Sequence, residues 1–237
     1  MTFTVLGHCE RTGQVGIGVA TYSLVVGALC PAIKGGVGVI SSQAFVNFEL
    51  RTLGLNLLRQ GHPAAQAIEL MKAADPQIEF RQLMVLDAFG RSAGFTGSRT
   101  RPWTGHKVGP GYVVAGNVLA GVQVVDAMAQ AFTSSVGADL DERLLRAIEA
   151  GRDAGGQVGG KGHLPERSAA LIVCGRTQID ELDLRVDSHP EAVAQLRAIR
   201  EEWAPYRAFH YLRHIDPAKA PPQEAFVAEL EAKGKKA

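Results

Sequence analysis

The chain opens with TFTVLGHCERTGQVGIGVAT (Thr2–Thr21), a stretch whose pattern predicts two strands joined by a tight turn. The strands are expected at Thr2–His8 and Gln14–Thr21, and the turn at Glu10–Gly13, where the glycine supplies a positive φ. Glycines alternate with apolar residues in the second strand, which lets another layer or a ligand approach that face closely. The stretch therefore predicts a β-hairpin inside a buried sheet.

Strand-like and helix-like segments follow this hairpin in groups. Further strands are predicted over residues 36–42, 80–87, 91–95, 112–116, 168–174 and 182–187. Helices are predicted over residues 44–60, from 63 onward, from 122, over 139–151 and over 190–203, with loops at 96–111 and 155–162. Because hairpins separate the helices, antiparallel pairing is expected, and a parallel doubly wound sheet fits less well. Two stacked sheets with a helical layer outside each, an α+β four-layer αββα sandwich, would bury every apolar face.

The sandwich is expected to occupy residues 1–204, with a tail over residues 205–237. The tail is rich in proline and charge and contains one short amphipathic piece around Phe226. We expect it to lie at the periphery or to pack against a partner.

Composition excludes several classes of protein. The 237 residues carry a net charge of +1 with both signs interspersed, so nucleic acid is not expected as a partner. Three cysteines without a CxxC spacing predict reduced core thiols and a cytoplasmic location. There is no apolar run of membrane-spanning length and no signal-peptide pattern, so neither a membrane partner nor export is expected.

The familiar catalytic and nucleotide-binding motifs are incomplete. Gly155–Gly162 nearly spells a phosphate loop, but Gly follows Lys161, and the run is better read as a mobile loop near a ligand pocket. His210 and His214 have helical spacing but no third ligand, and no Gly-x-Ser-x-Gly elbow is present. We therefore expect no cofactor and no metal.

Thr2 is the candidate nucleophile. Methionine is normally removed before a small residue, so the mature chain would begin with a threonine whose hydroxyl lies beside its own α-amine. A free α-amine has a pKa of about 8, close enough to neutrality to accept the hydroxyl proton. Thr2 could therefore serve as both nucleophile and base, although the alternative is that it simply follows the start codon.

Hydroxyl and amide side chains recur where the predicted strands end. They are Thr21, Ser23, Gln43, Asn47, Asn117 and Ser168. Such groups can orient an amide substrate or donate to an oxyanion, although each alone is a common cap or turn residue. Three loop arginines, Arg99, Arg101 and Arg167, either bind a substrate carboxylate or are simply solvated, and solvation is favoured for each.

Several separated segments resemble, in the same order, a bacterial family catalogued as domain of unknown function 1028. The segments are residues 2–5, 38–47, 95–97, 109–112, 116–117, 119–121, 168–173 and 183–187, and the resemblance extends to about residue 202. It implies an N-terminal-nucleophile hydrolase fold, again an αββα sandwich, with Thr2 in the nucleophile position. It also implies an oxyanion held by backbone amides together with Asn117 or a neighbour of similar reach. One departure is that the Lys and Asp of proteasome-like members have no clear equivalent, since Lys34 matches only roughly.

Two functional hypotheses follow. The first is an amidase-like hydrolase that cleaves a C–N bond in a small amide, lactam or peptide-like metabolite. The second is a ligand-binding or assembly protein that keeps the fold without the chemistry, for which retained Met1 is the discriminating sign. Tyr206, Phe209 and Tyr211 beyond the main fold favour a homo-oligomer, with a dimer expected first.

Overall fold

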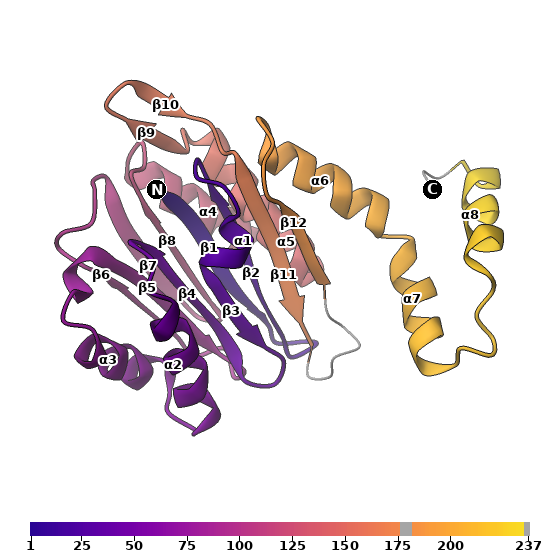
Figure 1. Cartoon of the computed structure of the whole chain (residues 1–237), viewed down its shortest axis with the longest axis horizontal. Helices are drawn as coiled ribbons and strands as arrows, with labels where there is room; N and C mark the ends of the chain where they lie inside the picture. The colour runs from indigo at the N-terminus through magenta and orange to yellow at the C-terminus, as the bar shows by residue number, and fades with distance from the viewer. Residues whose placement is uncertain (176–181, 235–237) are drawn as a thin grey trace.

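The computed structural model describes residues 1–175 and 182–234 and contains two stacked sheets between two helical layers (Figure 1). The larger sheet has the strand order β12-β11-β2-β1-β8-β7, and the smaller has the order β3-β4-β5-β6. All neighbouring strands pair antiparallel. Helices α4, α5 and α6 cover the larger sheet and α2 and α3 the smaller one (Figure 1). The predicted αββα sandwich is therefore confirmed.

The bounds of the elements are as follows. The strands are β1 (Thr2–Cys9), β2 (Gln14–Thr21), β3 (Pro31–Lys34), β4 (Gly38–Ala44), β5 (Arg81–Asp87), β6 (Ser92–Thr96), β7 (Thr104–Gly109), β8 (Tyr112–Asn117), β9 (Gln157–Gly159), β10 (Gly162–Leu164), β11 (Ser168–Cys174) and β12 (Leu182–Val186). The α-helices are α1 (Val26–Leu29), α2 (Phe48–Arg59), α3 (Ala64–Ala74), α4 (Val122–Ser134), α5 (Leu140–Asp153), α6 (Ala192–Trp203), α7 (Tyr206–Ile215) and α8 (Gln223–Ala232), and a 3-10 turn lies at Ile78–Phe80.

The first hairpin lies in the middle of the larger sheet, with Phe3 opposite Ala20. Its glycine face receives a helix and not a ligand. A Cβ on Gly16 would lie 2.7 Å from a methyl carbon of Leu144 on α5. The bare face therefore sets how closely the helical layer packs.

Some local predictions were wrong. The segment 96–111, predicted as a loop, contains β7, and the glycine-rich run contains the short β9–β10 ladder. The sequence patterns also missed α1 and β3, and residues 44–47 precede α2 instead of opening it. The reason is that β7 is a half-exposed edge strand without apolar alternation, held by its ladder to β8.

The layer between the two sheets changes character along the strands. On β1, Phe3 and Val5 pack toward the helices, whereas Leu6 and the Thr4 hydroxyl face the other sheet. Most of this layer is apolar and includes Leu6, Ile17, Val19, Val39, Met84, Leu86, Val113 and Ile172. At one end it becomes polar, through Thr2, Thr4, Thr21, Ser41, Gln43, Gln82, Asn117 and Ser168, all of them buried. We call these eight residues the polar end.

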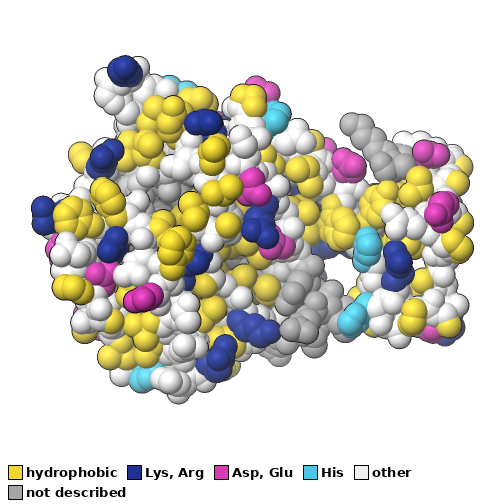
Figure 2. Space-filling view, in the orientation of Figure 1, with side chains coloured by type: hydrophobic (Ala, Val, Ile, Leu, Met, Phe, Trp, Pro, Cys, Tyr) yellow, Lys and Arg dark blue, Asp and Glu magenta, His cyan; other side chains and the backbone are white. Residues whose placement is uncertain are grey.

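Residues 206–232 form an arm of two helices, α7 and α8, that projects from the sandwich beyond α6 (Figure 1). Figure 2 shows open space between the lower part of the arm and the sandwich. Stacked Phe209 and Phe226 rings, 4.2 Å apart, join the two helices. An ion pair between Arg207 and Asp141, at 3.6 Å, ties α7 to α5.

Within residues 1–175 and 182–234, no helix combines the length and the apolar character needed to cross a bilayer.

Candidate functional site

Thr2 lies at the start of the central strand of the larger sheet, between β2 and β8. It is 5 % exposed and faces Asn117 across the ladder. The hydroxyls of Thr2 and Thr21 both donate to the carbonyl oxygen of Met1. The structure therefore brings two of the predicted site residues together at the first peptide bond.

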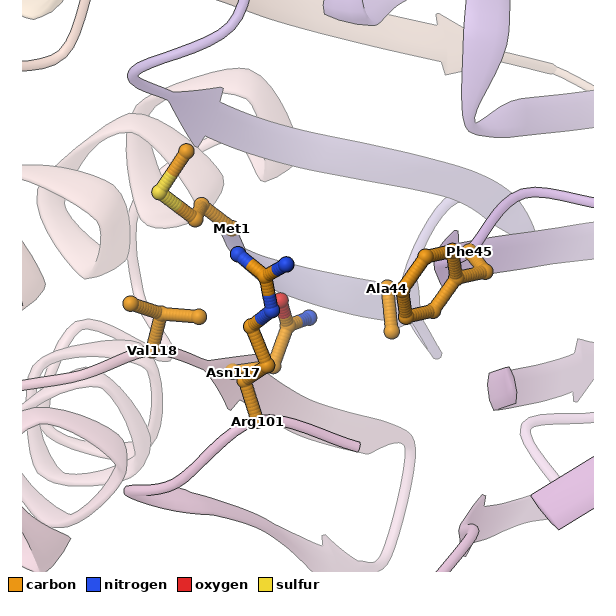
Figure 3. A pocket seen from close by; sticks show the side chains of 6 residues that line it. All are labelled: Met1, Ala44, Phe45, Arg101, Asn117 and Val118. Atoms are coloured by element: carbon orange, nitrogen blue, oxygen red, sulfur yellow. The ribbon is translucent and has the colours of Figure 1, made fainter. Parts of the chain in front are cut away.

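A cavity of about 140 Å³ opens beside this peptide bond. It is lined by Met1, Ala44, Phe45, Arg101, Asn117 and Val118. Figure 3 shows these side chains arranged around the space, with the Arg101 side chain extended toward Met1. Asn117 is therefore a wall residue of the cavity that borders the proposed nucleophile.

Two lining residues have left-handed backbones, Ala44 with φ of 68° and Val118 with φ of 59°. Such a conformation is a genuine outlier for a β-branched residue, and strained backbones of this kind cluster at functional sites. The turn at Val118 directs its N–H to the carbonyl of Arg101, at 3.1 Å. This hydrogen bond holds the Arg101 backbone against the end of β8.

A chain of buried side-chain hydrogen bonds supports the cavity from behind. The Thr4 hydroxyl donates to Gln43 Oε1 at 2.7 Å, and Gln43 Nε2 donates to Gln82 Oε1 at 2.8 Å. Gln82 Oε1 also accepts from Asn117 Nδ2 at 3.0 Å, and Gln82 Nε2 donates to the Gly116 carbonyl at 2.9 Å. The network links both sheets and fixes the Asn117 amide, as expected for a satisfied buried polar network.

Sequence reasoning missed Gln82 and Gln157. The only signal for Gln82 is a glutamine at the start of an otherwise apolar predicted strand. Gln157, on β9, accepts from the Tyr22 backbone N–H at 2.7 Å and forms a bridge with Leu119. Its Nε2 is buried without a hydrogen-bond partner among the described residues. Gln157 thus spans the ends of β2 and β8, just beyond the start of β1.

The remaining predicted site residues perform structural tasks. The Ser168 hydroxyl donates to the Ser23 carbonyl at 2.8 Å and accepts from the Val26 N–H at 3.1 Å, which holds the loop after β2. Asn47 caps α2 by accepting from the Glu49 N–H at 3.0 Å. Of the predicted site residues, Asn117 lines the cavity, whereas the others are not among its lining residues: Thr2, Thr21, Ser23, Gln43, Asn47 and Ser168.

The electrostatics at the N-terminus favour an uncharged amine. Burial lowers the pKa of the Met1 amine below 8.0; Cys30 acts in the opposite direction, and the Arg101 charge lowers the pKa further. Burial also raises the pKa of the Cys30 thiol to about 12.

Among the described residues, no three His, Cys, Asp or Glu side chains gather closely enough to hold a metal ion. His210 is stacked on Trp203, with ring centroids 4.9 Å apart, so it has a packing role.

The comparisons with known proteins found a matching family and similar solved structures. Residues 2–196 match the family described as "Family of unknown function (DUF1028)". A Silicibacter pomeroyi protein, whose crystal structure is described with the same family, is similar over 85 % of this chain and 88 % of its own, at 29 % identity and a TM-score of 0.77. Anbu, the ancestral β-subunit from Yersinia bercovieri, aligns over 93 % and 98 % at 12 % identity and a TM-score of 0.41, a likeness too low to define the fold. Among curated proteins, none matches this sequence.

Proposed function

The chain belongs to the DUF1028 family, and we propose that it is an N-terminal-nucleophile hydrolase that cleaves the C–N bond of a small amide, lactam or peptide-like metabolite. The observation that carries the proposal is the position of Thr2. Its hydroxyl lies at the first residue of the central strand, beside a cavity and beside the amine that removal of Met1 would create.

The proposed reaction has two steps. First, the Thr2 Oγ1 attacks the substrate carbonyl while its proton passes to the Thr2 α-amine, and that proton then moves to the leaving nitrogen as the C–N bond breaks. Second, water attacks the resulting Thr2 ester, the amine accepts a proton from the water, and the acid leaves as the hydroxyl is restored. One residue supplies both the nucleophile and the base.

The surroundings of Thr2 support these roles. Without Met1, the Thr21 hydroxyl loses its carbonyl partner and becomes available to orient the new amine or a water molecule. Asn117 Nδ2 uses one hydrogen for Gln82 and has a second to offer a developing oxyanion. Burial lowers the pKa of the Met1 amine, and we expect the same burial to favour the neutral form of the Thr2 amine, which is the form that acts as a base.

The test begins with intact-mass spectrometry of untagged protein, which should show the loss of one methionine. The trimmed protein is then treated with a β-lactone, whose ring opens on a reactive hydroxyl to leave an ester on the protein. We expect one adduct, located on Thr2 by peptide mapping and absent from Thr2→Ala. An adduct elsewhere, or equal labelling of the variant, would contradict the proposal.

A second candidate is a ligand-binding or assembly protein that retains the fold without the chemistry. One observation favours it: in the untrimmed chain, both hydroxyls already have a partner in the Met1 carbonyl. If Met1 is fully retained in the purified protein, the Thr2 nitrogen stays in a peptide bond and cannot act as the base that the mechanism needs. This result would replace the hydrolase with the second candidate.

A further inference from the structure

The cavity at the N-terminus contains one cationic side chain and no acidic one. Of its lining residues, Arg101 alone carries a charged side chain. Its guanidinium extends toward Met1 in Figure 3, and its charge lowers the pKa of the amine there, after burial and against the influence of Cys30. A group that enters this cavity therefore meets a positive charge near the candidate nucleophile.

Arg101 differs from the two other arginines that the sequence singled out. Arg99 lies over the Phe80 ring at 4.1 Å, and Arg167 lies over the Tyr22 ring at 5.6 Å. Within the described residues, the Arg101 guanidinium has no hydrogen bond, ion pair or aromatic ring of its own. Neither Arg99 nor Arg167 lines the cavity.

The backbone around Arg101 is held in place although its side chain is exposed. Its carbonyl accepts from the N–H of Val118, at 3.1 Å, and the next turn is held by Leu119 N–H donating to the Trp103 carbonyl at 3.0 Å. The preceding Thr100 is buried and donates to the Gly97 carbonyl at 2.8 Å. The loop backbone is therefore already ordered, and only the side chain of Arg101 must be fixed when the guanidinium binds a ligand.

The cavity also has apolar lining residues, among them Phe45. Phe45 is 47 % exposed, and its ring packs edge-on against Phe80 at 5.6 Å. A ligand that suits both features has a short apolar portion and an anionic group. A guanidinium binds a carboxylate through two parallel hydrogen bonds, which fixes the orientation of the ligand as well as its affinity.

From these observations we infer that Arg101 is the specificity-determining residue of the site and that the substrate is a small amide carrying a carboxylate close to the scissile bond. The simplest members of this class are N-acyl amino acids. The inference rests on the proposed hydrolase function, because the Arg101 cavity is taken to be where the amide binds.

Binding is measured on trimmed Thr2→Ala protein, in which the chemistry is blocked. The probes are N-acetyl-alanine, N-acetyl-phenylalanine and N-benzoyl-glycine, each compared by calorimetry with its own carboxamide. We expect at least one carboxylate to bind about 10-fold or more tightly than its carboxamide, and Arg101→Met to reduce this preference to near one. Arg101→Lys should restore part of the preference, because a lysine returns the positive charge without the two parallel hydrogen bonds of a guanidinium.

Arg99→Met is the matched control, since it removes a nearby arginine that does not line the cavity, and the preference should persist. Equal binding of acids and carboxamides by Arg101-containing protein, absence of binding by all acids, or a preference that survives in Arg101→Met would each overturn the inference. The β-lactone adduct on Thr2 reports on the hydrolase proposal separately. An adduct without carboxylate preference rejects only the role of Arg101, whereas a preference without an adduct rejects only the chemistry.

Discussion

The layer between the two sheets has an apolar end and a polar end. At one end, Leu6, Ile17 and Met84 meet as fully buried apolar side chains. At the polar end, Gln43, Gln82 and Asn117 are equally buried but joined by hydrogen bonds between their amides. The same strands supply both ends, so the change reflects side chains and not backbone architecture.

The difference between the apolar end and the polar end indicates which residues are expected to stabilise the fold and which to serve function. Apolar burial contributes about 25 cal/mol per Å² without fixing the orientation of individual groups. A buried amide network contributes little net stability but fixes each donor and acceptor, and it is costly when one member is lost. We expect the apolar end to hold the sandwich together and the polar end to position Thr2 and Asn117.

The largest expected effect is on activity. Thr2→Ala should reduce turnover of any identified amide by at least about 10³-fold, because it removes the proposed nucleophile. The thermal midpoint should change little, since the substitution removes only a hydroxyl and a methyl group at the first residue of β1. Thr12→Ala, in the exposed turn after β1, is the matched control and should keep full turnover. If the unsubstituted protein, Thr2→Ala and Thr12→Ala all turned over the amide at similar rates, Thr2 would have no part in the mechanism.

The second effect is on stability. Leu6→Ala should reduce the free energy of unfolding by about 3 kcal/mol, because it leaves a cavity in the apolar end. Urea denaturation provides the measurement, and activity per folded molecule should be retained. A loss of activity without a loss of stability would contradict the division between the two ends.

Gln82→Leu tests the polar end directly. It keeps a similar volume but leaves the Nε2 of Gln43 and the Nδ2 of Asn117 without their shared acceptor. We expect a loss of about 2 kcal/mol in unfolding free energy, together with reduced kcat. Unlike Leu6→Ala, this variant should lower the activity of the folded protein, and normal kcat would show that the network does not position Asn117.

A smaller effect is expected on the pH dependence. Burial and the Arg101 charge should lower the pKa of the Thr2 amine as they do for Met1, although Cys30 acts the other way. The base is active when neutral, so the rate should rise with pH through an inflection below 8.0. Arg101→Met should move this inflection upward, because a lowering charge is removed. The pH dependence of kcat/KM measures the inflection in the unsubstituted protein and in Arg101→Met. An inflection of the unsubstituted protein above the pKa of an ordinary α-amine would contradict the expectation.

The smallest expected effect on the sandwich comes from removing residues 205–237. In the arm, only Phe209 and Leu230 are buried, so the free energy of unfolding should change by less than about 1 kcal/mol. We propose that the arm instead pairs with a second copy of the chain, since Tyr211 and Ile215 are exposed beside its stacked rings. Light scattering should show a dimer for the full chain and a monomer after truncation. A full-length monomer would reject the proposal.

Much of the fold could be predicted from the sequence. The alternation of residue types predicted β1 and β2, and the helical spacing of apolar residues predicted α2, α4 and α5. Several observed boundaries differ from the predicted ones by a few residues. Of the polar residues predicted at strand ends, Thr21, Gln43 and Asn117 are buried in the structure. Local patterns did not reveal β7 or β9, because hydrogen bonding to a neighbouring segment holds these short strands, and their burial pattern is irregular.

The sequence by itself determined the αββα sandwich and the position of Thr2 at the head of a strand, because both follow from local periodicity and chain order. Only the tertiary structure decided which polar residues meet. It placed Gln82 and Asn117 in one network, Arg101 in the cavity wall, and Asn47 at a helix cap. The physical reason is that such contacts depend on strand register and sheet stacking, which join residues far apart in the chain.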